Sequence, residues 1–410
     1  MLAVRPRGAW VNIGSVSNNL AVRATSKGGF LMGKYTTYVG MDVHARSVTA
    51  SAVDTSTGEV FSRTFSGAAM GQEIAAWARG LPQPAYCAYE SGCTGFALAR
   101  ELRAAGLDCD VIAVSTLPLS QRDRRRKCDR LDARAIRREI ANPDASHGVV
   151  WVPGEKTEGE RDLCRAYYQA VADCKRAKQR LLMFLMRHGH VWDERTRTGR
   201  RRKPAGRAFE AWLATVRLAE PSAERAFESY RRQVRAAAEE VATLRGEVRE
   251  LAASPGNRPY VDALRCVKGI QAETAMLAVA EIGDFSRFPS GRRVSSWLGT
   301  VPTDGSSGER DRHGGITKAG NKYLRRALVE GWSGAASWRS GRKAVPRGAV
   351  VSAEAQALCA RANARLFGRY GHLTSAGKCH NKAKVAVVSE LVRWVWVIGL
   401  QVQRELASPA

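Results

Sequence analysis

The sequence predicts an α/β domain with a mixed sheet in its first third, then two long helices, then a mainly helical C-terminal region. Three observations support this fold class. Short strand-like and helix-like runs alternate over residues 36–140. In the middle third, apolar residues recur at spacings of four and three, which is the pattern of long helices with one apolar seam. The last third opens with two apolar helical runs joined by a Lys-Gly turn.

The order of elements in the first third is specific. Three strand candidates come first, and helices then alternate with strands. The predicted strands are 38–43, 48–53, 60–64, 85–89 and 110–114, with helices at 74–78, at 96–105 and from Asp129 onward. Three strands followed by this alternation is the order of a ribonuclease-H-like domain.

Composition and charge restrict the class of protein. The chain has 410 residues and 44% hydrophobic residues, enough for two or three folded domains. Its net charge of +26 favours a polyanionic partner, and nucleic acid is the commonest one. A ribosome-like or membrane-surface protein is the alternative. No run approaches the ~20 apolar residues of a membrane span, so no membrane partner is expected.

Cysteine usage and the chain start add two expectations. The nine cysteines form no Cys-x-x-Cys pair, which indicates reduced thiols of a cytosolic protein and no zinc site. Met32 directly precedes the first strand, so residues 1–31 are interpreted as an appended or misassigned start. The predicted domains are an extension at 1–36 that is poorly ordered, a catalytic α/β domain at 37–150, a helical region at 151–258 and a C-terminal domain at 259–410.

Four carboxylates are the strongest candidates for a site. Asp42 and Glu90 each end a predicted strand, and Asp129 and Asp132 stand three apart on a predicted helix, where they share a face. Acidic residues gathered in this way can hold hard divalent cations, and two such ions can assist phosphoryl transfer. For any one of these residues alone, a helix cap or a surface ion pair is the alternative.

Basic residues crowd the helix that carries the acidic pair. They are Arg122, Arg124, Arg125, Arg126, Lys127, Arg130, Arg134, Arg137 and Arg138. This charge would draw a phosphate backbone toward the carboxylates, or it would only offset them.

The middle third has two heptad-like seams. The first joins Leu163, Tyr167, Ala170, Cys174, Ala177, Leu181 and Phe184, and the second joins Phe227, Tyr230, Val234, Ala237, Val241, Leu244, Val248 and Leu251. Such seams predict a coiled-coil hairpin or a dimer zipper, with helices buried in a globular bundle as the alternative. The basic loop at 195–204 between them is either a phosphate contact or a plain exposed charge run.

The C-terminal third holds two further candidates. Residues 264–275 have the pattern of a helix–hairpin–helix, whose turn at Lys268 could hold a phosphate, although Gln271 stands where a second glycine is usual. The Gly/Ser/Pro loop at 299–308 contains Ser306 and Ser307. Cations follow it: Arg310, Arg312, His313, Lys318, Lys322, Arg325 and Arg326. A serine among cations could attack a phosphate, but such loops are usually only loops.

Together these motifs resemble the DEDD transposases of the bacterial insertion-sequence family often called IS-one-ten, with its IS-eleven-eleven branch. The resemblance runs from about residue 37 to about residue 400. It rests on Tyr38-Val-Gly-Met-Asp-Val-His44, Tyr89-Glu-Ser-Gly-Cys-Thr-Gly95, Lys127-Cys-Asp-Arg-Leu-Asp-Ala133, Arg180–Gly189, Ala280–Phe288, Ser306-Ser-Gly308 and Ile316–Arg326. The departures are Cys128 in place of threonine, Gln271 in place of glycine, and the extra residues 1–31.

The resemblance implies more than the residues alone. It implies a RuvC-like domain that holds Mg²⁺ (or Mn²⁺) on Asp42, Glu90, Asp129 and Asp132, and a C-terminal transposase domain whose nucleophile is Ser307, with Ser306 as the near match. It further implies a tetramer, a dimer of dimers, with a composite site across protomers joined by the coiled coil. The implied partners are donor DNA, target DNA and an element-encoded guide (bridge) RNA, in the nucleoid of the bacterial cytoplasm.

Three functions are consistent with these residues and with the resemblance. The leading one is an RNA-guided recombinase that excises and inserts its own element. The second is a RuvC-like, structure-specific nuclease in which the serine loop is structural. The third is a nucleic-acid-binding protein without catalysis, which the four carboxylates and Ser307 argue against.

Overall fold

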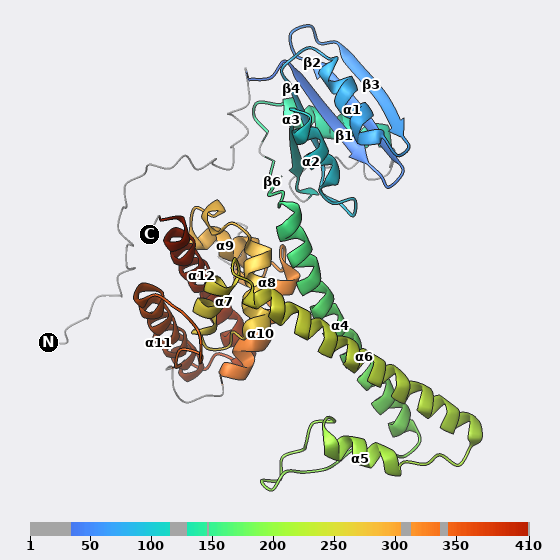
Figure 1. Cartoon of the computed structure of the whole chain (residues 1–410), viewed down its shortest axis with the longest axis vertical. Helices are drawn as coiled ribbons and strands as arrows, with labels where there is room; N and C mark the ends of the chain where they lie inside the picture. The colour runs from blue at the N-terminus through green and yellow to red at the C-terminus, as the bar shows by residue number, and fades with distance from the viewer. Residues whose placement is uncertain (1–33, 115–128, 146, 305–312, 337–342, 409–410) are drawn as a thin grey trace, which may run out of the picture. The chain divides into compact units, whose positions relative to one another are not determined.

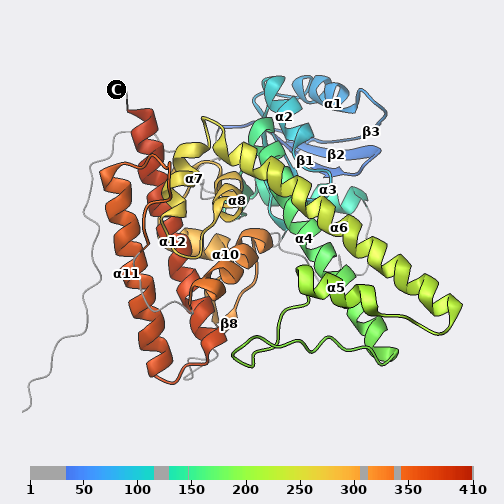
Figure 2. The same ribbon diagram turned by 60° about the horizontal axis from the view of Figure 1, so that its bottom comes forward.

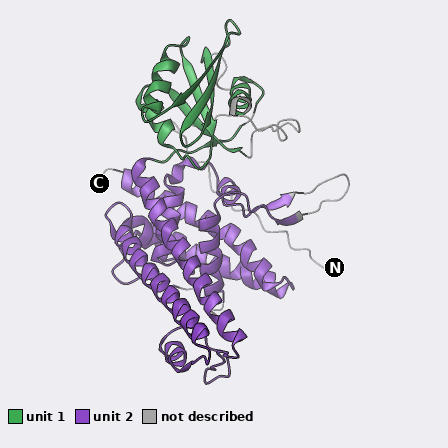
Figure 3. Ribbon diagram, turned by 90° about the vertical axis from the view of Figure 1, so that its right-hand side faces the viewer, with its two compact units in different colours: residues 1–153 green, residues 154–410 purple. Residues whose placement is uncertain are grey.

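The computed structural model describes residues 34–114, 129–145, 147–304, 313–336 and 343–408. The chain folds as two compact units, residues 1–153 and 154–410, coloured separately in Figure 3. The finer domain limits expected from the sequence stay predictions.

The first unit is built on a six-stranded mixed sheet in the order β3-β2-β1-β4-β5-β6 (Figure 1). Its strands are β1 (Thr37–Val43), β2 (Ser47–Asp54), β3 (Val60–Ser66), β4 (Ala85–Glu90), β5 (Asp108–Ile112) and β6 (Val149–Val150). The first three form an antiparallel meander, β4 and β5 run parallel to β1, and β6 is antiparallel to β5. The predicted mixed sheet is confirmed, and its order is consistent with a ribonuclease-H-like domain.

Helices cover both faces of this sheet. The helices α1 (Met70–Arg79) and α2 (Ala97–Ala104) share a core with Val39 and Met41 of β1 and with the alternate residues of β4. The opposite face carries Tyr38 and Tyr86, which cluster with Ile136 and Ile140 of α3 (Asp129–Ala141). Successive strand residues point to opposite faces, so Asp42 and Glu90 belong to the face that α3 covers.

The helix α3 lies directly on β1 at Gly40. A Cβ atom at Gly40 would stand 2.3 Å from the backbone nitrogen of Arg137 and 2.4 Å from the carbonyl oxygen of Ala133. The Arg137 guanidinium reaches past this contact and donates to Ser51 Oγ on β2 at 2.9 Å. Burial lowers the pKa of Arg137. Only glycine permits this approach of helix backbone to strand backbone.

In the second unit, two long helices pack against each other, α4 (Glu155–Arg187) and α6 (Pro221–Ala253) (Figure 2). Their distal halves share a small core with α5 (Arg207–Thr215), through residues such as Phe184, Phe209 and Phe227. The start of α4 and the end of α6 instead join the main core of the unit. The pair is therefore antiparallel, and the residues of its predicted apolar seams are buried or half-buried.

The main core of the second unit is helical, as predicted. Its further elements are α7 (Arg258–Arg265), α8 (Ala272–Ile282), η4 (Phe285–Arg287), α9 (Gly291–Trp297), β7 (Pro302–Asp304), β8 (His313–Ile316), α10 (Lys322–Ala335), α11 (Ala353–Ser375) and α12 (His380–Ala407). By length and composition α12 is apolar enough to cross a membrane. One side of it, however, belongs to the core shared with α7 and α10, which explains an apolar composition in a core helix of a bundle. The buried residues are Val387, Val388, Leu391, Val392, Val395, Ile398 and Val402.

The close approach at Gly40 gives the first prediction. The variant Gly40→Ala should destabilise the first unit by about 1–3 kcal/mol, since the added methyl group must push two backbones apart. Hydrogen exchange of the β1 and α3 amides measures the effect, and protection should fall in both elements. Gly92→Ala is the matched control, because nothing lies within 4 Å of a Cβ there. Equal protection in the two variants would contradict this account of the helix contact.

Candidate functional site

The strand register places Asp42 beside Glu90. In the parallel pair β1–β4, Met41 is aligned with Tyr89, so the next residue of each strand occupies the equivalent position. Neighbouring strands lie ~4.8 Å apart, and both residues are on the same face at the carboxyl ends of their strands. The structure thus puts these two predicted carboxylates on adjacent strands at one edge of the sheet.

The helix α3 carries the other two acidic positions. Its second half, with Ile140 and Ala141, clusters with Tyr35 and Tyr38 at the beginning of β1. Its first turns therefore extend toward the strand ends, and Asp132 there is half-buried. Asp129 is the first residue of α3, and its side chain lies outside the described part of the structure.

The described carboxylates do not form a complete metal-binding site in this structure. Among the described side chains, no group of three His, Cys, Asp or Glu residues is arranged to hold a metal ion. Asp42 contacts the exposed His44, whose Nε2 lies 3.1 Å from Asp42 Oδ2. His44 is not among the site residues predicted from the sequence, although it stands two residues after Asp42 in the same alternating pattern.

The candidate serines fall between two described strands. β7 pairs antiparallel with β8, with Pro302 opposite Ile316 and Asp304 opposite His313. Ser306 and Ser307 are in the segment that links them and lie outside the described residues.

Backbone hydrogen bonds join the two chain segments at the base of this hairpin. The amides of Thr317, Lys318 and Asn321 donate to the carbonyls of Val301, Gly299 and Trp297. Gly299 and Gly320 have φ of +70° and +100°, and a Cβ on either would stand about 2 Å from a facing carbonyl oxygen. Glycine is required at both positions, so the two chain segments at the hairpin base lie at a fixed spacing.

A buried carboxylate stabilises the start of α10 behind this hairpin. Glu281 of α8 accepts from Nε and Nη2 of Arg165 at 2.7 and 2.8 Å, and from Asn321 Nδ2 at 2.6 Å. Asn321 also caps α10 by accepting from the Leu324 amide. Burial works against the charge of Arg165, but the hydrogen bonds to Glu281 and the attraction of Glu281 and other nearby groups together outweigh it and raise the pKa of Arg165. The sequence gives no signal for this network, since Arg165 and Glu281 are 116 positions apart.

The predicted nucleic-acid contacts lie in different surroundings. Lys318 and Lys322 are exposed. Arg325 donates to the Leu298 carbonyl at 2.8 Å, and Arg326 pairs with Glu330 at 2.9 Å. The side chains outside the described residues are Arg124, Arg125, Arg126, Lys127, Arg130, Arg310 and Arg312.

Lys268 differs from the sequence expectation. It is only 6% exposed, its amide donates to Asn363 Oδ1, and its ammonium lies over the Phe367 ring. The turn is pressed against α10, where a Cβ on Gly331 would stand 2.1 Å from the Gly269 carbonyl oxygen. The phosphate contact at Lys268 stays a prediction, and the Lys268 side chain would have to reach it from a largely buried position.

Two family models of transposases and several curated transposases are similar to this chain. A family model described as a transposase matches residues 39–189, and one described as transposase IS116/IS110/IS902 family matches residues 261–345. The putative transposase y4qE of Sinorhizobium fredii is 32% identical over 321 residues, which cover 78% of this chain and 76% of the relative. The transposase for insertion sequence element IS1533 of Leptospira borgpetersenii is 28% identical over 265 residues, covering 63% of this chain and 74% of the relative.

These matches, together with a mixed α/β unit and a helical unit, define a DNA transposase. The chain belongs to the IS116/IS110/IS902 family of insertion-sequence transposases. The resemblance found in the sequence is confirmed at the level of the family and of the enzyme class.

The Glu281 network gives the second prediction. Arg165→Met should lower the free energy of unfolding of the second unit by about 3–5 kcal/mol, because it leaves a buried carboxylate without its cation. Arg165→Met combined with Glu281→Met should recover part of this loss. Arg176→Met on the same helix removes an exposed pair with Asp173 and should cost under about 1 kcal/mol. Urea denaturation measures all three; an Arg165 variant as stable as the Arg176 control would refute the role of the network.

Proposed function

We propose that this transposase is an RNA-guided recombinase that excises and inserts its own element by metal-assisted serine attack on DNA. The observation that carries the proposal is the alignment of Asp42 with Glu90 at the strand ends, on the face covered by the acidic helix α3. Carboxylates on neighbouring strand ends can hold a divalent cation, and such ions assist phosphoryl transfer.

The proposed metal ligands are Asp42, Glu90, Asp129 and Asp132, with Mg²⁺ or Mn²⁺ as the ion. All four offer carboxylate oxygens, which are the donors that hard divalent cations prefer. When bound, such ions activate one oxygen and stabilise the other in phosphoryl transfer. The chain's own part is to hold Asp42 and Glu90 on rigid neighbouring strands.

The proposed nucleophile is Ser307. Its Oγ attacks a DNA phosphorus and gives up its proton, the bond from phosphorus to one sugar oxygen breaks, that oxygen takes up a proton and leaves as a sugar hydroxyl, and the phosphate stays joined to the serine as a phosphodiester. The ester retains the phosphodiester linkage, so a sugar hydroxyl of another strand can later displace the serine and rejoin DNA without further energy. The hairpin of β7 and β8 supports this role because its base is fixed by backbone hydrogen bonds and Ser307 belongs to the stretch of sequence between its two strands.

The remaining parts of the proposal concern assembly. The antiparallel helices α4 and α6 are proposed as a coiled-coil arm that joins protomers into a dimer or tetramer. Donor DNA, target DNA and a guide RNA are the proposed partners, and the net charge of +26 supports several polyanionic ones. The proposed location is the bacterial cytoplasm, at the nucleoid.

The serine role gives the third prediction. Ser307→Ala should abolish both recombination and the covalent protein–DNA adduct, because the attacking oxygen is removed. Denaturing gels of reactions with guide RNA, donor DNA, target DNA and Mg²⁺ detect the adduct. Ser306→Ala is the matched control and should retain both activities. Strand cleavage that survives in Ser307→Ala would instead favour a nuclease that hydrolyses DNA with its carboxylates.

The carboxylates give the fourth prediction. Asp129→Asn and Asp132→Asn should each abolish recombination, as should removal of divalent ions by a chelator, while guide-RNA affinity stays nearly unchanged. A recombination assay and an RNA-binding titration measure the two properties. Asp144→Asn, an exposed position beyond the end of α3, is the control and should behave as wild type. Full recombination by both α3 variants would eliminate the metal site.

A further inference from the structure

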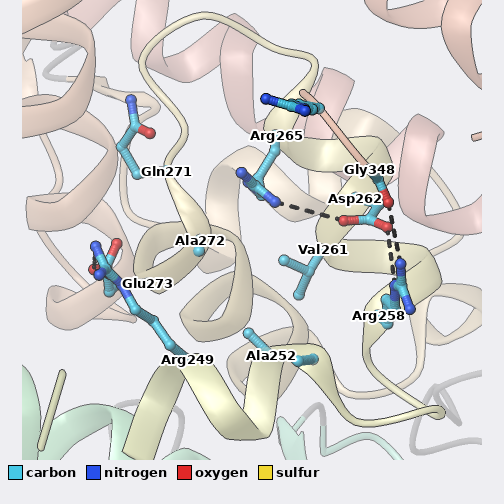
Figure 4. Close-up of a pocket in the computed structure, with 12 residues that line it drawn as sticks. Arg249, Ala252, Arg258, Val261, Asp262, Arg265, Gln271, Ala272, Glu273 and Gly348 are labelled. Atoms are coloured by element: carbon cyan, nitrogen blue, oxygen red, sulfur yellow. Dashed lines mark hydrogen bonds and ion pairs between the residues drawn. The ribbon is translucent and has the colours of Figure 1, made fainter. Parts of the chain in front are cut away.

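A pocket of ≈670 Å³ opens in the second unit between the end of α6, the helix α7 and the start of α8 (Figure 4). Four arginines line it, namely Arg249, Arg258, Arg265 and Arg347. The fold, rather than the local sequence, gathers them, since they come from α6, from α7 and from the segment before α11. None of them belongs to the carboxylate site or to the serine hairpin.

Two buried carboxylates orient three of these arginines. Asp262 is 5% exposed and lies 3.4 Å from Arg258 and 3.6 Å from Arg265. Glu273, at the start of α8, is 9% exposed and lies 2.9 Å from Arg249. Figure 4 shows Arg265 directed from α7 toward Asp262, at the edge of the pocket. A guanidinium has five N–H donors, so each keeps donors for a further partner.

The pocket has a surplus of positive charge. Four arginines and two carboxylates line it, which leaves a formal charge of 4 − 2 = +2. Arg347 is exposed and makes no ion pair with any residue in the described part of the chain. Arginines already held in place by carboxylates bind a phosphate at a low cost in side-chain entropy. The lining therefore favours an anion, and a phosphate group is one whose oxygens match the planar fork of an arginine.

The size and the other walls restrict the anion further. The volume matches a small-molecule site, so it is larger than a lone phosphate needs and too small for a double helix. Ala252, Ala253 and Val261 form an apolar wall, and Gln271 adds an amide that can hydrogen-bond. A phosphate with an attached sugar or base that has left its stack fits these surfaces.

We propose that this pocket binds the phosphate and sugar of an unpaired nucleotide in the nucleic acid that the transposase handles. The proposal rests on the proposed function, since it requires a nucleic-acid strand as ligand. It adds a place where the helical unit grips single-stranded segments, separate from the chemistry at the carboxylates and at Ser307.

The test compares a single-stranded oligothymidylate with a duplex of the same length, using fluorescence anisotropy of the full-length protein across a salt series. The double variant Arg265→Gln/Arg347→Gln should weaken single-strand binding about tenfold. The slope of log affinity against log salt should fall by about 0.7 for each phosphate that the variant no longer neutralises. Duplex binding should change much less.

Two further variants isolate the pocket from general charge. Arg232→Gln/Arg235→Gln removes the same charge from exposed positions on α6, and it should weaken both ligands slightly and to the same degree. Ala253→Trp keeps all charges and fills the pocket from an exposed position, and it should weaken single-strand binding alone.

The outcomes distinguish failure of the pocket from failure of the proposed function. If the wild-type protein bound neither ligand at low salt, the proposed function itself would fail. If it bound both, and the pocket variants matched the Arg232/Arg235 control, the pocket proposal alone would be overturned. Equal losses for single strand and duplex in the pocket variants would also overturn it, because the ligand would not then be an unpaired nucleotide.

Discussion

The first unit depends on the contact between the backbones of α3 and β1 at Gly40. With no side chain at that position, the helix lies on the strand at a distance that any Cβ would prevent. The register of β1 with β4 then sets Asp42 level with Glu90 on the face under the helix. These two constraints are made by backbone atoms. They explain why acidic residues from separate parts of the chain end at one edge of the sheet.

Much of the secondary structure of this unit could be predicted from the sequence. The alternation of residues along a strand depends only on neighbouring positions. The predicted strand at 38–43 corresponds to β1, Thr37–Val43, and Asp129 begins a helix as predicted. The strand expected at 110–114 is instead β5, Asp108–Ile112, because Val114 lies beyond the last paired residue, Ile112. The two-residue strand β6 has no signal in the sequence, since its pairing with β5 depends on distant residues.

The site was predictable in its residue types and less so in its geometry. The sequence predicted that Asp42 and Glu90 lie at strand ends. It contains no pattern that indicates that the two strands are aligned neighbours in the sheet. The same reason explains why the burial of Lys268 could not be foreseen, since its turn packs on α10 and α11, which lie far away along the chain. Arg165 and Glu281 could not be paired from sequence at all, since their contact exists only through the packing of α4 on α8.

The second unit uses its few buried carboxylates to fix arginines. Glu281 holds Arg165, Asp262 holds Arg258 and Arg265, and Glu273 holds Arg249. The chain has a net charge of +26, and in this arrangement ion pairs with carboxylates orient some of its guanidinium groups. Diffuse charge attracts any polyanion, whereas oriented arginines can select the shape of a phosphate group.

Anomalous diffraction from crystals grown with Mn²⁺ tests the central claim most directly, because it locates the ion without reference to activity. The account predicts manganese at the carboxyl ends of β1 and β4, within ~2.5 Å of carboxylate oxygens from Asp42, Glu90 and the first turn of α3. Manganese bound elsewhere, with Asp42 and Glu90 turned to separate regions of solvent, would contradict it.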